Sequence, residues 1–182
     1  MTVLDYLVIL LLCAGTLVGF FHGLVRSVAH ILLLYVVTLV AAFSYPPLAG
    51  AFRLLAPRSS LQLRSAVAFL FVLLTLFLMA AYTMRPSFKK REPFLPGSVD
   101  RIGGMVAGFF LTGLWIALGF VIVDFLLSVS WIKWEPLRIG IAHLVASSAM
   151  VKCINTMLPY IVMTLRPWFE PFGGLPRLFV IQ

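Results

Sequence analysis

The residues of this chain that could do chemistry are a few carboxylates and histidines. Asp5 and Asp124 lie near the ends of two hydrophobic runs, and His22 and His30 flank the short connection between the first two runs. Ionisable groups within a membrane are costly and are candidates for proton or ion transfer. Both carboxylates are close enough to a run's end to reach water, so we expect them to be solvated at the membrane interface.

A catalytic or metal site is not indicated by the remaining residues. The two histidines could bind a metal or respond to pH, but no third ligand is near them in the sequence. No nucleophile and base, metal-ligand spacing or phosphate-binding loop is recognisable. The two cysteines, Cys13 and Cys153, are expected to be small packing residues. The sequence therefore predicts a protein that is not an enzyme, with no catalytic, cofactor-binding or metal-binding residues.

Small residues recur at every fourth position in two apolar segments: Gly15, Gly19 and Gly23, and Gly104, Gly108 and Thr112. Positions four apart share one face of a helix, and such a smooth face lets a second helix approach closely. In a chain with four spans, the end of the first helix and the start of the fourth lie at the same depth. We therefore predict that these two helices pack together through their small residues.

A charged pair is expected beside this contact. Asp100 and Arg101 begin the fourth apolar segment, and Arg26 follows the first one on the same predicted side of the membrane. An acid at a helix N-terminus is favoured by the helix dipole, and an arginine can extend its head group to the interface. A structural ion pair between Arg26 and Asp100 is the sharper hypothesis. It would fasten the first helix to the fourth.

The composition is that of a membrane protein. Of the 182 residues, 62% are hydrophobic and 11% are charged, whereas a soluble domain has roughly 45–50% apolar and about 25% charged residues. The net charge of +8 comes from basic residues between the hydrophobic runs. Anionic lipid head groups explain that placement. We expect membrane lipid as a partner and no nucleic acid.

Four segments are long enough to cross a hydrocarbon core of about 30 Å, which takes about 20 residues. They run over residues 3–21, 28–43 with a weak extension to 52, 65–84 and 102–127. Lipid offers no hydrogen-bond partner to a free backbone, so each must be helical. Pro46 and Pro47 are expected to end or kink the second helix. We expect the first segment to be a span rather than a removable signal peptide, because no Lys or Arg precedes it.

The tail differs from the rest, which divides the chain into a four-helix transmembrane domain at 1–128 and a tail at 129–182. Aromatic and charged residues of an interfacial belt open the tail: Trp131, Lys133, Trp134 and Glu135. One or two amphipathic helices on the membrane surface should follow. A fifth span is the alternative, and Lys152, Asn155 and Pro159 in mid-segment oppose it. The fold class is all-α, with about four transmembrane helices and an interfacial helical tail.

Two motifs resemble those of a known family. Asp5-Tyr6 leads into Gly19-x-x-x-Gly23-x-x-Arg26, and Asp100-Arg101-x-Gly103-Gly104-x-x-x-Gly108 opens the last long helix. Together they resemble the colicin V production protein (CvpA) family of bacterial inner-membrane proteins, over about residues 5–128. His22 and Ser27 depart from the family pattern, which has a basic residue and often an acid there. The resemblance implies a multi-pass protein of the bacterial cytoplasmic membrane and a role in toxin production, export or envelope processes.

Three functional hypotheses remain open. The first is a CvpA-like protein that acts without catalysis through protein partners, either other membrane proteins or further copies of itself. The second is an accessory subunit of a larger bioenergetic or photosynthetic complex, which the short loops and the many aromatic residues would suit. The third is a small transporter or channel, which would need polar residues along a shared face, and the apolar segments contain almost none.

Overall fold

Six helices make up the described part of the chain. The computed structural model describes residues 2–55, 60–89, 97–127 and 135–169. The helices are α1 (Val3–His22), α2 (Leu24–Leu55), α3 (Leu61–Lys89), α4 (Gly97–Leu127), α5 (Glu135–Ser147) and α6 (Ala149–Phe169). The predicted belt residues Trp131, Lys133 and Trp134 lie outside the described residues.

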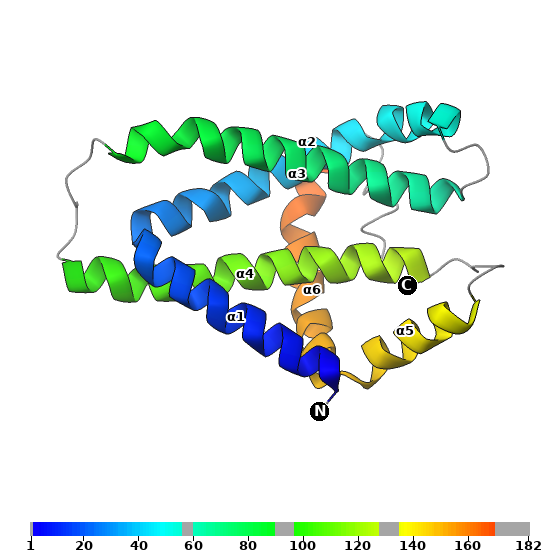
Figure 1. Cartoon of the computed structure of the whole chain (residues 1–182). Coiled ribbons are helices and arrows are strands. Elements are labelled where there is room, and N and C mark those ends of the chain that lie inside the picture. Colours follow the sequence, from blue (N-terminus) through cyan, green and yellow to red (C-terminus); the bar gives the residue numbers. More distant parts are fainter. Residues whose placement is uncertain (1, 56–59, 90–96, 128–134, 170–182) are drawn as a thin grey trace.

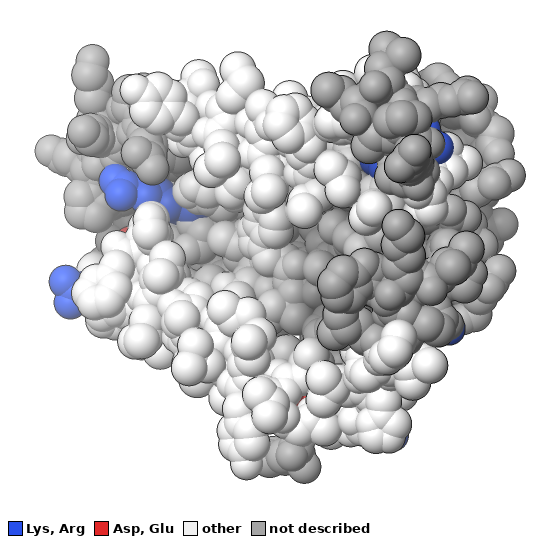
Figure 2. Space-filling model, turned by 45° about the vertical axis from the view of Figure 1, so that its right-hand side comes forward, with Lys and Arg blue, Asp and Glu red and all other residues white. Residues whose placement is uncertain are grey.

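Four of these helices are long and apolar enough to cross a membrane. The candidate spans are Val3–His22, Leu24–Phe52, Leu63–Met84 and Gly97–Leu127. Between 17% and 33% of each span is buried inside the protein, so the rest of each apolar surface faces outward. In Figure 2 the described part of one face is almost free of charge, with Lys and Arg at its edges. The prediction of an all-α membrane protein with about four spans is confirmed.

The second helix does not end at its two prolines. It continues from Leu24 to Leu55 with Pro46 and Pro47 inside it, so of the two expected outcomes, an end or a kink, the prolines do not end the helix. Packing on α3 holds both sides of the proline pair, because Tyr45 and Ala49 are buried and the Tyr45 ring lies edge-on to Phe69 at 6.1 Å. Contacts with a neighbouring helix thus offset the backbone hydrogen bonds that the prolines remove.

The helices pack as two connected pairs (Figure 1). α1 contacts α4 most extensively, while α2 contacts α3 and then α4. The largest buried cluster joins α2 and α3 to the C-terminal half of α4. α4 is therefore the element that connects the two pairs, and its N-terminal half carries the contact with α1.

The tail helix α6 packs on the bundle. It runs across the direction of α2, α3 and α4 in Figure 1 and contacts α1 and α4. Near its end, the Phe169 ring is buried and lies 4.6 Å from the Phe43 ring of α2. The Tyr35 hydroxyl donates to the Thr164 carbonyl at 3.0 Å. α6 is not among the four candidate spans of the described residues, and its position at the membrane interface stays a prediction.

Candidate functional site

The small residues predicted to pack together meet at the contact between α1 and α4. A Cβ atom added to Gly108 would lie 2.7 Å from the Gly19 Cα and 2.6 Å from the Gly15 carbonyl oxygen. One added to Gly15 would lie 2.6 Å from the Thr112 Cβ. These distances are too short for any side chain, so the two backbones touch directly. Such a contact gains dispersion energy that larger residues would prevent.

The turn between α1 and α2 consists of Gly23 alone. Its φ of 78° is a conformation that residues with a side chain rarely adopt. The Gly23 N–H donates to the Gly19 carbonyl, which ends α1, and the Gly23 carbonyl accepts from Ser27 N–H, which begins α2. A glycine here therefore leaves α2 without a capping side chain of its own.

Asp100 supplies that missing cap from α4. Its Oδ1 accepts a hydrogen bond of 2.9 Å from the Leu24 N–H, the first backbone donor of α2. The carboxyl group lies so close to Gly23 that a Cβ there would be 2.9 Å from the Asp100 Cγ. An acceptor at a helix N-terminus satisfies a free N–H and opposes the positive end of the helix dipole. We call this contact the Asp100 clip.

Replacing Asp100 with alanine should destabilise the protein by about 1–2 kcal/mol, because the Leu24 N–H loses its acceptor. Thermal unfolding in detergent would measure the loss. Asp124→Ala is the matched control, since Asp124 is an exposed carboxylate on the same helix. Equal stability of the two variants would contradict a capping role for Asp100.

The two arginines of the predicted set lie near this clip. The Arg101 guanidinium lies 5.7 Å from the centroid of the Phe20 ring, a cation–π contact between α4 and α1. Arg26 is half-buried in the first turn of α2. The predicted ion pair between Arg26 and Asp100 stays a prediction.

A double-mutant cycle of Arg26→Gln and Asp100→Asn would test that ion pair. Both changes remove charge and keep shape, whereas an arginine at position 100 would not fit against Gly23. An ion pair predicts that the loss in the double variant is smaller than the sum of the single losses, by about 0.5–3 kcal/mol. If the loss of stability in the double variant equals the sum of the two single losses, Arg26 and Asp100 do not form an ion pair.

Asp5 forms a second clip that sequence reasoning missed. It is only 1% exposed, so the expectation that it is solvated is wrong. Its Oδ2 accepts from the Thr2 N–H at 2.7 Å and from the Thr2 hydroxyl at 3.1 Å. Its Oδ1 accepts from the Ser148 hydroxyl and from the Met150 N–H at 3.1 Å. One carboxylate therefore caps the N-termini of both α1 and α6, and we call this contact the Asp5 clip.

Part of the Asp5 clip can be recognised from the sequence. Thr2 and Asp5 have the spacing of a capping box, in which a threonine and an acid three residues later satisfy each other's backbone N–H groups. Ser148 stands between α5 and α6, and its hydroxyl accepts from the Val151 N–H at 3.3 Å. Nothing local indicates that the two caps share one carboxylate.

The remaining candidate residues include the two histidines. Among the described residues, no group of three or more His, Cys, Asp or Glu could hold a metal ion. The rings of His22 and His30 lie 6.3 Å apart at the end of a groove between the helices.

These features define a multi-pass α-helical membrane protein in which glycine faces and two carboxylate clips hold the helices together. The model of the colicin V production protein family matches residues 4–159. The chain therefore belongs to this family. The match continues past residue 128 into α6, so it includes α5 and the first half of α6. Neither the search of curated proteins nor that of solved structures found a match.

Proposed function

We propose that this protein supports the production or export of a colicin V-type toxin, or a related envelope process, by binding protein partners in the bacterial inner membrane. The observation that carries the proposal is the family match over residues 4–159. In this proposal the protein catalyses no reaction. Its partners are other membrane proteins or further copies of the chain.

The roles of the family-pattern residues support a non-catalytic function. Gly19, Gly104 and Gly108 form the α1–α4 contact, and Asp100 caps α2 beside Gly23. Each of these residues contacts a neighbouring helix. The motifs hold the helices together, and the outer faces of these helices are open to lipid or to partner helices.

A second candidate is an accessory subunit of a larger membrane complex. The observation that favours it is the outward position of large aromatic residues. Phe21, Tyr82 and Phe110 are 80%, 73% and 59% exposed. Aromatic side chains on the outside of a helix bundle provide contact area for neighbouring helices.

The deciding experiment combines deletion with native purification. Deletion of the gene should reduce toxin export or weaken the envelope, and the intact gene should restore the phenotype. Purification in mild detergent from the protein's own membranes should yield the chain with stoichiometric protein partners or as an oligomer. Partners from a bioenergetic or photosynthetic complex would favour the second candidate. A deletion strain with normal export and envelope would overturn the proposal.

A further inference from the structure

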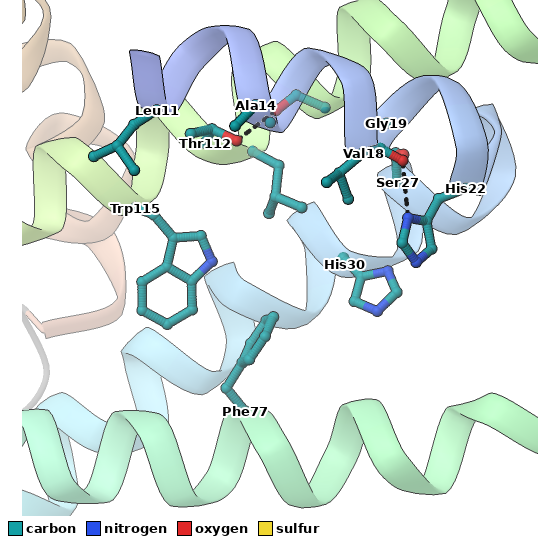
Figure 3. A pocket seen from close by; sticks show the side chains of 13 residues that line it. Leu11, Ala14, Val18, Gly19, His22, Ser27, His30, Phe77, Thr112 and Trp115 are labelled. Carbon is teal, nitrogen blue, oxygen red and sulfur yellow. Dashed lines mark hydrogen bonds between the residues drawn. The ribbon is translucent and has the colours of Figure 1, made fainter. Parts of the chain in front are cut away.

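A groove of about 400 Å³ lies between the first four helices. One wall is a row of four rings, His22, His30, Phe77 and Trp115, which we call the aromatic row. Successive ring centroids in this row are 6.3, 6.3 and 5.0 Å apart. Figure 3 shows Trp115 at one end of the groove and the two histidines at the other. The volume is within the range of roughly 300–1,000 Å³ that small-molecule sites occupy.

Backbone hydrogen bonds fix the chemistry of the two histidines. The Nδ1 of His22 lies 2.8 Å from the Val18 carbonyl oxygen, and the Nδ1 of His30 lies 2.6 Å from the Arg26 carbonyl oxygen. A carbonyl only accepts, so both Nδ1 atoms must carry hydrogen. In the neutral ring, Nε2 is then an acceptor. The Nε2 atom of each neutral histidine therefore accepts a hydrogen bond from a ligand that carries a donor.

The opposite end of the groove offers a donor. The indole N–H of Trp115 can only donate, and no acceptor among the described residues pairs with it. The floor is made of Gly15, Gly19 and Gly108, at the place where α1 and α4 are in direct contact. The groove thus presents acceptors at one end, a donor at the other and apolar walls between them.

We propose that this groove binds a lipid-soluble quinol, an aromatic ring with two hydroxyl groups opposite each other and an apolar tail. One hydroxyl donates to a histidine Nε2, and the other accepts from the Trp115 N–H. The ring packs along Phe77, and the tail extends into the bilayer. A hydrocarbon chain of an ordinary lipid would fill the apolar walls but leave these polar groups without partners, which is costly in a membrane.

Quenching of Trp115 fluorescence would test the site. The full chain with W131F, W134F and W168F keeps Trp115 as its single tryptophan, because the sequence has four. This protein is reconstituted in phosphatidylcholine vesicles and titrated with a decyl-substituted benzoquinol kept reduced by ascorbate. We expect saturable quenching. The dimethyl ether of the same ring, which has no hydroxyl, should need about tenfold more ligand for half-saturation.

The histidines provide the matched variants. His30→Phe should raise the half-saturating concentration about tenfold, and His143→Phe, on exposed α5, should leave it unchanged. His22→Gln, at the exposed end of the aromatic row, should also weaken binding. It replaces His30→Phe as the test if that variant does not fold. Quenching that rises linearly with ligand, or that is the same for the quinol and its dimethyl ether, would show simple partition into lipid and overturn the proposal. Unchanged binding in the histidine variants would overturn it as well.

Discussion

Replacing Gly108 with leucine is expected to separate α1 from α4. The new Cβ would lie 2.7 Å from the Gly19 Cα and 2.6 Å from the Gly15 carbonyl oxygen. Backbone atoms of a helix cannot move aside as the end of a flexible side chain can. Overpacking costs about 1–3 kcal/mol where side chains can rearrange, so we expect a loss of more than about 3 kcal/mol here. Unfolding in mixed detergent micelles would measure it.

Gly113 provides the control on the same helix. A Cβ added there meets nothing within 4 Å, so Gly113→Leu should leave the free energy of unfolding nearly unchanged. The two variants place the same side chain on the same helix, and only its surroundings differ. If both lose the same stability, the cost comes from leucine itself and close packing of α1 on α4 is not the cause.

The second large effect is expected at the Asp5 clip. Asp5→Ala removes the acceptor of the Met150 N–H and of the Ser148 hydroxyl. Both donors are then left without a partner at the start of α6, so the first turn of α6 should open more often. We expect the Met150 amide to exchange its hydrogen about tenfold faster or more. Hydrogen exchange followed by mass spectrometry would report it.

Variants of two neighbouring serines distinguish loss of the Asp5 clip from a general loss of stability. Ser148→Ala should speed exchange in the same turn, because the Ser148 hydroxyl also accepts from the Val151 N–H. Ser147→Ala should not, because that exposed hydroxyl only donates to the Leu144 carbonyl. Unchanged exchange at Met150 in Asp5→Ala would mean that other contacts, such as those of Phe169, hold α6 in place.

The glycine faces are the part of the site that sequence spacing can indicate. Residues four apart share a helix face, so the spacing of Gly15, Gly19 and Gly23 is enough to define a contact surface. The count of spans then places the end of α1 beside the start of α4. Both inferences use local periodicity and length alone, which also explains why the membrane fold itself was predictable.

The two clips depend on distances along the chain that periodicity does not encode. Asp100 acts on α2 through Leu24, and Asp5 acts on α6 through Ser148. For a related reason the proline pair does not end α2, since the packing of Tyr45 on α3 outweighs the local preference to stop a helix. Each of these features depends on contacts between residues far apart in the chain, and a single sequence does not indicate which distant residues are in contact.

The clips also set the order in which the protein can complete its structure during synthesis. A ribosome makes the chain from its N-terminus. The Leu24 N–H therefore has no cap until Asp100, 76 positions later, has been made. Asp5 can accept from the Ser148 hydroxyl only after Ser148, 143 positions later, has been made. The hairpin of α1 and α2 therefore enters the membrane before the Leu24 N–H at the start of α2 has its acceptor. The Asp5 clip can form only after Ser148 and Met150 have been made, when the five helices before α6 are already complete.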